Sequence, residues 1–380
     1  MKSAIHLRPV EVDHKLPPLR ALTSLRFFAA MYVVFFHESR KPDHIALFPL
    51  AARFVDSGYT AVTLFFVLSG FILAYNYEQI RSRKEFWISR FARIYPVYFL
   101  SLLPVFITPH WSHHPRPGMV GMILTFCLLQ SWWVPLAASL NAVAWTLSVE
   151  ASFYAAFPFL LPWIERVRRR TFIGIQVAYL IFLCVLPLLS FFPTTAAAGS
   201  QLVAWMESPF PLARLNAFVL GVYAGVVFRR EMRHCAVRDG GVPSMDSPRT
   251  WQLVCVALVP LALLCVAPSW FYWPLRTGLL QLSYAFLIPL LARVQWPVLT
   301  NHWMQMAGEI SYGIYVLQFP VLFVYDDIMG RLFPHAGHIS LLYIAVLICV
   351  AYVVFRWVEI PARLIIRQTL SGRPVPVRPI

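Results

Sequence analysis

The chain has 380 residues, of which 59% are hydrophobic and 13% are charged. Soluble domains are about 45–50% apolar and about 25% charged, so this composition excludes an ordinary soluble domain and indicates a protein that crosses a membrane several times. The net charge of +15 does not indicate nucleic-acid binding, because the basic residues lie in short loops between apolar runs, as they do in membrane proteins.

Eleven apolar runs approach the ~20 residues that a membrane-crossing helix needs. They lie near residues 21–38, 57–77, 91–108, 118–134, 143–164, 172–192, 210–228, 251–268, 272–292, 309–329 and 339–356. If all the arginine-rich segments are cytoplasmic, one run between Pro104 and Trp163 does not cross the membrane. We expect this to be 118–134, whose flanking prolines disfavour a continuing helix.

The sequence therefore predicts an all-α, polytopic integral membrane bundle of about ten crossings, with one re-entrant or interfacial segment and both termini in the cytoplasm. We expect residues 1–18 and 364–380 to be cytoplasmic tails around a membrane domain at 19–363. Six cysteines, five of them within apolar runs and none in a C-x-x-C pair, indicate packing residues rather than disulfides or a metal site.

Two ionisable side chains lie within the first apolar stretch. Arg26 and His37 are eleven residues apart, about three turns of an α-helix, so they point from the same face at different depths. A charge within hydrocarbon costs about 2.5–3.5 kcal/mol, so a cation and a proton-transfer group on one face indicate a functional site. The alternative is that Arg26 extends to the membrane surface and His37 only ends the helix.

The next feature is Ser69-Gly70, which interrupts an aromatic run. Ser69 lacks the strand-turn-helix context of a nucleophile elbow, so we interpret Gly70 as a site of close helix packing.

Arg90 and Arg93 lie three residues apart at the cytoplasmic start of a helix, and so share a face. Two guanidiniums at the membrane surface suit the phosphates of a nucleotide-linked donor. The alternative is that these charges only orient the helix in the membrane.

Glu150 is a second intramembrane charge, and the predicted topology places it in the outer half of the membrane together with His37. The two would form an acid–base pair in which the carboxylate orients the imidazole and the imidazole removes a proton from a hydroxyl. The alternative is a structural ion pair of Glu150 with Arg26, Arg214 or Arg276.

Near the C-terminus, the segment 308–320 places Glu309, Tyr312, Tyr315 and Gln318 along one helix, where they would line a polar cavity. Helix capping is an alternative explanation of Glu309, and packing of Tyr312 an alternative for that side chain.

Together these motifs resemble the bacterial membrane-bound acyltransferase-3 family, O-acyltransferases that modify surface and secreted sugars. In chain order they are Arg26 followed by His37; Phe65-Phe66-Val67-Leu68-Ser69-Gly70-Phe71; Arg90-x-x-Arg93-Ile94-x-Pro96-x-Tyr98; Trp145-x-Leu147-Ser148-Val149-Glu150-x-x-Phe153-Tyr154; Gly308-Glu309-Ile310-Ser311-Tyr312-Gly313-Ile314-Tyr315; and Glu359-x-Pro361-x-Arg363. The resemblance runs from about residue 19 to 363.

The resemblance implies a membrane enzyme of the bacterial inner membrane. It would move an acyl group, with acetyl the expected one, from cytoplasmic acyl-CoA to a hydroxyl of a carbohydrate or glycolipid acceptor on the far side, without a metal. By position, the catalytic role falls on His37 with Glu150, and binding of acyl-CoA falls on Arg90, Arg93 and Arg26. His37, oriented by Glu150, would deprotonate the hydroxyl or be transiently acylated itself.

Two positions depart from the family pattern, which often has a second acidic residue where this chain has Ala151 and often a histidine where it has Gln318. Neither departure bears on the assignment of His37; both concern the acceptor and any secondary proton relay. Two other functions stay open: a transporter that exports a sugar or an acylated product, in which Arg26 and Glu150 would line a transport path, and a scaffold within a polysaccharide assembly complex.

Overall fold

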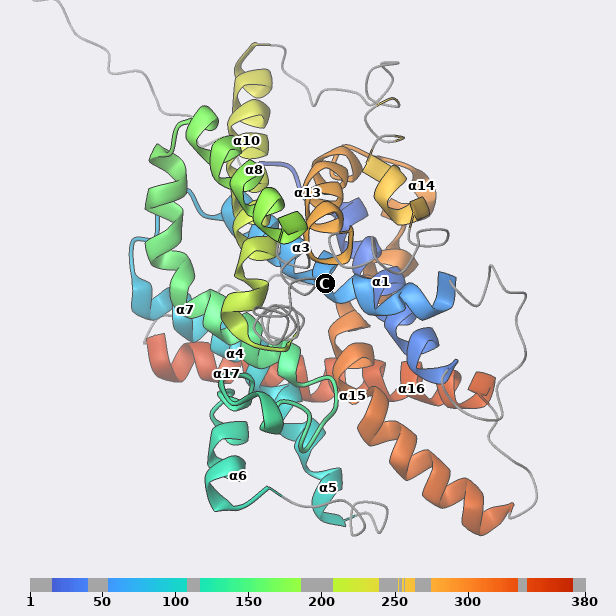
Figure 1. Ribbon diagram of the computed structural model, residues 1–380. Helices are drawn as coiled ribbons and strands as arrows, with labels where there is room; N and C mark the ends of the chain where they lie inside the picture. Colours follow the sequence, from blue (N-terminus) through green and yellow to red (C-terminus); the bar gives the residue numbers. More distant parts are fainter. Residues whose placement is uncertain are drawn as a thin grey trace, which may run out of the picture.

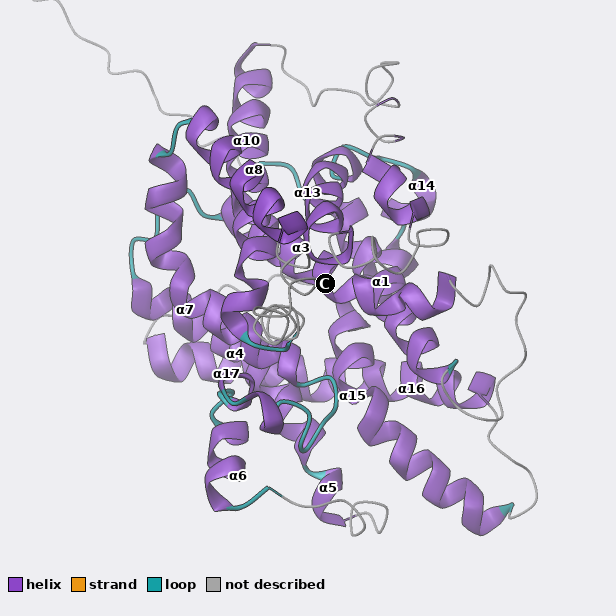
Figure 2. Cartoon of the chain, viewed as in Figure 1, coloured by secondary structure: helices purple, strands orange, loops and turns teal. Residues whose placement is uncertain are grey.

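The structure is a computed structural model, and it describes residues 16–39, 54–107, 117–185, 208–238, 252, 255, 257–263, 275–333 and 340–371. Figure 2 shows helices and connecting loops throughout this described part, with no strand in it, as the sequence predicts.

Figure 1 labels the main elements along the chain. They are α1 (Arg20–Glu38), α3 (Ala61–Asn76), α4 (Arg83–Leu102), α5 (Pro104–Ile107), α6 (Met119–Phe126), α7 (Trp145–Arg166), α8 (Arg169–Val185), α10 (Pro211–Arg238), α13 (Leu280–Leu291), α14 (Pro297–Thr300), α15 (His302–Leu332), α16 (Ser340–Val354) and α17 (Ile360–Ser371). One-turn 3-10 helices lie at Ser57–Thr60, Gln130–Trp132 and Val134–Leu136, and single π-turns at Leu275–Leu279 and Phe355–Glu359.

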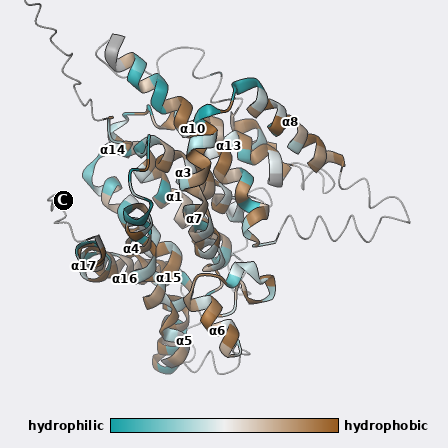
Figure 3. Cartoon of the chain, turned by 90° about the vertical axis from the view of Figure 1, so that its left-hand side faces the viewer, coloured by the Kyte–Doolittle hydropathy of each residue, from teal (hydrophilic) through white to brown (hydrophobic). Residues whose placement is uncertain are grey.

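Five helices in the described part are long and apolar enough to cross a membrane: 54–76, 145–166, 211–235, 302–332 and 340–370. The chain is therefore a helical, multi-pass membrane protein, and Figure 3 shows apolar residues along most of these helices. This count does not support about ten crossings. One reason is that α4 contains Arg83, Lys84, Glu85, Arg90 and Arg93 and is far more polar than its apolar second half suggested. Half of the expected run 251–268 lies outside the described residues.

The run 118–134 does not form a crossing helix, in agreement with the prediction. Its helix, α6, has only 8 residues, about 12 Å, which is far short of the ~30 Å hydrocarbon layer. Leu128 then adopts a positive φ of 59°, and one-turn helices follow. Ser148 of α7 binds this irregular backbone: its hydroxyl oxygen accepts from the Ser131 amide at 3.2 Å, and its hydroxyl donates to the Leu128 carbonyl oxygen at 2.7 Å. The irregular backbone is thus satisfied within the protein, as a membrane requires.

Helices α3 and α10 form the centre of the bundle, where they pack backbone against backbone. A side chain added at Gly70 would collide with the Phe218 carbonyl oxygen, and one added at Gly221 would collide with the Val67 carbonyl oxygen. This confirms close helix packing as the reason for Gly70. A third helix joins this contact: Phe153 of α7 stacks on Phe218 of α10.

Helix α1 packs along α15, and their contacts set the depth of the polar residues on both. Gly308 of α15 lies directly against the Thr23 carbonyl oxygen of α1. At the start of the pair, Gln305 donates from Nε2 to Ser24 Oγ at 3.0 Å. Asn301 caps the N-terminus of α15, so Glu309 lies in the helix interior and the capping explanation of that residue is wrong.

The C-terminal segment continues from α16 through the π-turn into α17, which packs on α4. Helix α17 continues to Ser371, so the expected start of a tail at 364 falls inside a helix. The packing brings Glu359 beside Arg93 of α4, although the two residues are 266 positions apart in the chain.

Candidate active site

A cavity with three arginines lies between α1, α3, α4, α7 and α15; we call it the arginine cavity. It has a volume of about 110 Å³. Its lining residues are Arg26, Val62, Phe65, Phe66, Leu68, Ser69, Arg90, Arg93, Ile94, Thr146, Leu147, Glu150, Tyr154, Ser311, Tyr312 and Tyr315. The predicted site residues Arg26, Arg90, Arg93 and Glu150 therefore meet in one place.

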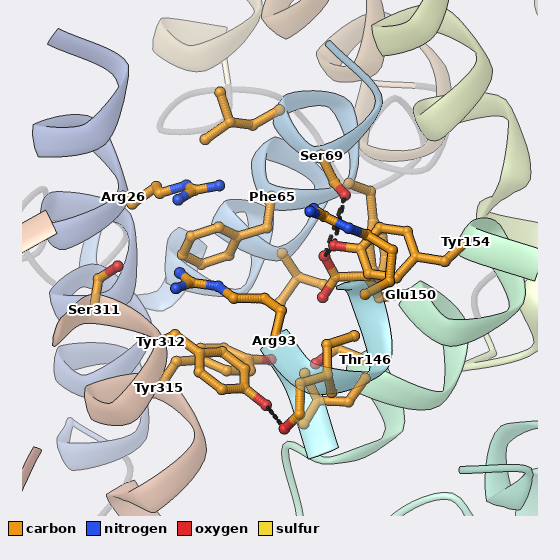
Figure 4. A pocket seen from close by; sticks show the side chains of 16 residues that line it. Arg26, Phe65, Ser69, Arg93, Thr146, Glu150, Tyr154, Ser311, Tyr312 and Tyr315 are labelled. Carbon is orange, nitrogen blue, oxygen red and sulfur yellow. Dashed lines mark hydrogen bonds between the residues drawn. The ribbon is translucent and has the colours of Figure 1, made fainter. Parts of the chain in front are cut away.

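The arginines reach the cavity from two helices. Figure 4 shows Arg26, from α1, and Arg93, from α4, extending into the same space beside Phe65. Ser82 caps the N-terminus of α4, since its hydroxyl oxygen accepts a hydrogen bond from the Glu85 amide at 3.2 Å. Because Arg26 lines an internal cavity, it does not extend to the membrane surface, which was the alternative interpretation of this residue.

The two arginines of α4 have different partners. Arg93 pairs with Glu359 at 3.0 Å, and Glu359 is fully buried and also binds Arg363. The guanidinium of Arg90 lies near the Phe86 and Tyr154 rings, 5.9 and 5.8 Å from their centroids. Among the described residues, neither Arg90 nor Arg26 forms an ion pair with a carboxylate. Their charges are thus available to an anionic ligand.

Glu150 is held by hydroxyl groups on the same wall. Tyr154, one helical turn later, donates a hydrogen bond to Glu150 Oε1, and Ser69 of α3 donates to the same oxygen at 3.2 Å (Figure 4). The ion pairs that the alternative interpretation proposed, with Arg26 or Arg214, are not formed, and the Arg276 side chain lies outside the described part. Among the described residues that line this cavity, Glu150 is the one carboxylate beside three arginines.

His37 lines a second cavity, of about 340 Å³, which we call the histidine cavity. Its lining residues are Val33, Phe36, His37, Tyr59, Val62, Thr63, Ala142, Val143, Trp145, Arg214 and Tyr315. His37 Nδ1 lies 2.8 Å from Gln318 Oε1, and the imidazole packs against Phe319, with ring centroids 4.9 Å apart.

The structure corrects one expectation about His37. The pairing with Glu150 is not formed, because α7 directs Glu150 toward Ser69 and the arginines, in the other cavity. His37 instead has Gln318, one of the two positions that depart from the family pattern, as a hydrogen-bond partner. Ala151 lines a neighbouring apolar pocket together with Trp87 and Phe91 of α4.

The two cavities share a wall. Val62 of α3 and Tyr315 of α15 line both of them. Tyr315 is hydrogen-bonded to Thr146 on the side of the arginine cavity (Figure 4). Arg26 and His37 thus occupy one face of α1 at two depths, as the sequence predicts, and each faces its own cavity.

Sequence reasoning missed several residues of these cavities. Tyr154 follows Glu150 by four residues, a spacing that places both on one face of a helix and that would have found it. Thr146, also four residues from Glu150, had the same signal. The sequence analysis names Gln318 and Arg214 but not their neighbours: Gln318 contacts His37, 281 positions away, and Arg214 lines the histidine cavity, and contacts between distant segments leave no local signal.

Comparisons with known proteins agree with the geometry. A family model described as an acyltransferase domain matches residues 19–356. The chain is 28% identical to acyltransferase MdmB of Streptomyces mycarofaciens over 94% of both chains, and 24% identical to a putative acetyltransferase, ORF330, of Acidianus two-tailed virus over 78% of this chain and 81% of that protein. It is 21% identical to the peptidoglycan O-acetyltransferase OatA of Listeria monocytogenes, over 90% of this chain and 55% of OatA.

No solved structure matches the chain. The family match covers most of the sequence, including the helices that carry Arg26, His37, Arg90, Arg93, Glu150 and Gln318. The relatives are named as transferases of acyl groups. The chain therefore belongs to the acyltransferase-3 family of membrane acyltransferases.

Proposed function

We propose that this protein is an integral membrane O-acyltransferase that moves an acyl group from cytoplasmic acyl-CoA to a hydroxyl of a carbohydrate or glycolipid acceptor. One observation carries the proposal: a cationic cavity and a cavity with a histidine lie on either side of one wall, formed by Val62 and Tyr315. A donor that enters one cavity and an acceptor that enters the other would meet at this wall.

The arginine cavity suits the donor. Arg90 and Arg93 lie two to three turns from the start of α4, which carries the basic residues of the cytoplasmic side, so they are placed to bind phosphate groups of coenzyme A. Arg93 would exchange its contact with Glu359 for a phosphate. The cavity is narrow, so the thin pantetheine arm and its thioester would extend past Arg26 toward Tyr315, while the nucleotide stays at the mouth.

In this proposal, His37 acts as the general base. It would take the proton from the acceptor hydroxyl while the oxygen forms a bond to the thioester carbon. The carbon–sulfur bond then breaks, and His37 returns the proton to the sulfur of coenzyme A. Glu150, in this proposal, acts in the donor cavity: its negative charge offsets part of the mutual repulsion of the three arginines.

The names of two relatives support this chemistry. One is an acyltransferase and one is an O-acetyltransferase of peptidoglycan, which favours acetyl as the transferred group and a surface polysaccharide as the acceptor. The basic segments support an orientation in the bacterial inner membrane with both termini cytoplasmic and with further crossings beyond the five apolar helices.

The test is transfer of a radiolabelled acetyl group from acetyl-CoA in membranes that contain wild-type protein, His37→Ala or His302→Ala at matched expression. His302 is exposed at the start of α15 and serves as the control. We expect label in the glycan or glycolipid fraction with wild type and His302→Ala, and a loss of at least about 100-fold with His37→Ala. Label transfer at the wild-type rate by His37→Ala would overturn the proposal, and no label with any of the three proteins would favour the transporter.

A further inference from the structure

The partner of His37 is itself held in a fixed orientation. Gln318 is 2% exposed and lies in the middle of α15. Its side-chain Nε2 donates to the Tyr315 carbonyl oxygen at 2.7 Å, one turn earlier in the helix. Its backbone carbonyl oxygen accepts from the Tyr343 hydroxyl of α16 at 2.9 Å. Gln318 is therefore fixed from both its side chain and its backbone.

This arrangement determines which end of the amide faces the imidazole. The Tyr315 carbonyl oxygen only accepts hydrogen bonds, so the NH₂ group of Gln318 has to face it. The amide oxygen then faces His37 Nδ1, at 2.8 Å. An amide oxygen also only accepts, so the bond forms when Nδ1 carries the proton. In the neutral imidazole Nε2 is then the basic nitrogen.

We propose that Gln318 is a positioning residue that holds His37 in the tautomer with a proton on Nδ1, so that Nε2 receives the proton of the acceptor hydroxyl. The inference rests on the proposed role of His37 as the general base. A neutral amide orients the ring without adding a negative charge beside it, so the basicity of His37 is left for the rest of the cavity to set. The sequence prediction gave this orienting role to a carboxylate, Glu150.

A merely structural role for Gln318 would be to tie α15 to α1. Gln305 provides the matched control, because it lies on the same helix, is the same residue type and also bonds to α1, at Ser24 and at the Arg20 carbonyl oxygen. It lies 13 residues before Gln318 and lines neither cavity. A role in helix packing alone predicts similar effects of replacing either glutamine.

The first experiment measures the tautomer directly in the full-length wild-type protein, reconstituted in lipid nanodiscs. Nitrogen-15 spectra of histidine-labelled protein, with the His37 signals identified by their loss in His37→Ala, should show a protonated Nδ1 and an unprotonated Nε2 at alkaline pH. A proton on Nε2 instead would overturn the proposal without any dependence on activity.

The second experiment compares Gln318→Glu, Gln318→Leu and Gln305→Leu. A carboxylate beside the ring stabilises the imidazolium, so Gln318→Glu should move the acid limb of the pH–rate profile upward by about one unit or more, and the pH dependence of carbethoxylation of His37 by the same amount. Gln318→Leu should lower turnover by about 10- to 100-fold with little change in the KM for acetyl-CoA. Gln305→Leu should leave both profiles unchanged.

The outcomes separate two kinds of failure. If His37→Ala retains transfer, the proposed function is wrong, whatever the tautomer. If His37→Ala is inactive but Gln318→Glu has the wild-type pH–rate and carbethoxylation profiles, the positioning role is wrong. If Gln318→Leu does not yield folded protein by size-exclusion chromatography, the nearly isosteric Gln318→Glu and the wild-type spectra decide.

Discussion

At the scale of single residues, the chemistry depends on which hydrogen-bond partner each buried polar group receives. Glu150 binds Tyr154 and Ser69 within the arginine cavity, and His37 binds Gln318 within the histidine cavity. Both groups are intramembrane residues that the sequence singles out, since ionisable residues in apolar helices are costly unless they are functional or paired. The structure changes their partners and thereby their roles.

The new placement of Glu150 leads to a prediction that differs from its expected pairing with His37. In Glu150→Gln, the loss of the one negative charge from the arginine cavity should lower the KM for acyl-CoA, whose phosphates are anionic, and change kcat by less than about tenfold. Steady-state kinetics in nanodiscs, with Glu85→Gln as the control on α4, provide the measurement. A fall of kcat by about 100-fold or more with an unchanged KM would instead support an acid–base partnership with His37.

Substitution of Arg90 tests whether this residue binds the acyl donor or only orients the helix in the membrane. In Arg90→Ala, the loss of charged hydrogen bonds to phosphate, worth about 1.5–3 kcal/mol, should raise the KM for acetyl-CoA by about 10- to 100-fold. Arg81→Ala removes an exposed charge from the same basic segment and should leave the KM unchanged. Equal, small effects of both substitutions would show that Arg90 serves membrane orientation only.

At the scale of helices, the packing of small residues decides which side chains can meet. Gly221 and Gly70 allow α3 and α10 to approach until their backbones touch, and Gly308 does the same for α15 and α1. Close approach in a membrane gains dispersion contacts that lipid does not provide. This packing fixes α1 and α3 around the arginine cavity, and it sets Gln318 opposite His37.

Gly221→Val should therefore destabilise the protein strongly, because any Cβ would overlap the Val67 carbonyl oxygen and a backbone atom cannot move aside as a side chain can. Overpacking of this kind costs about 3 kcal/mol or more. The measurement is thermal unfolding of detergent-solubilised protein, followed by loss of the monodisperse peak. Gly174→Val in α8, where an added Cβ would meet nothing within 4 Å, is the control. Equal stability of the two variants would contradict the described α3–α10 contact.

At the scale of the whole molecule, the arrangement brings the arginine cavity and the histidine cavity together across one wall, formed by Val62 and Tyr315. The proposed orientation has the start of α4 in the cytoplasm and α6 on the outer side. These ends of the bundle have opposite charge patterns: α4 begins with Arg83 and Lys84, whereas α6 has no charged residue. The distribution follows the rule that cytoplasmic loops collect arginine and lysine.

Labelling of single cysteines tests this orientation. In a variant without native cysteines, Met119→Cys, which is 80% exposed, should react with a membrane-impermeant maleimide in intact spheroplasts. Lys84→Cys, which is also exposed, should react only after the membrane is opened. Labelling of Lys84→Cys alone in intact spheroplasts would show the reverse orientation. Labelling of both residues there would show that they do not lie on opposite sides of the membrane.

The sequence by itself determined the class of the protein and most of its important residues. Composition and hydropathy require a helical membrane protein, because apolar surface of this extent is stable only in lipid. Ionisable residues within apolar runs pointed to Arg26, His37 and Glu150, since each is costly there without a purpose, and the three-residue spacing at a helix start pointed to Arg90 and Arg93. The prolines around 118–134 predicted that this run does not cross the membrane, and Gly70 predicted close helix packing; the structure confirms both.

Only the tertiary structure decided how these residues are divided between cavities. Hydrogen bonds between distant segments, such as that of His37 with Gln318 across 281 positions, leave no periodic or local trace in the sequence. The rotation of α7 about its axis, which turns Glu150 toward Ser69 instead of His37, follows from packing against α3, α4 and α10 together. Helix type is a local property, whereas the partner of a buried polar group is set by how several helices pack at once.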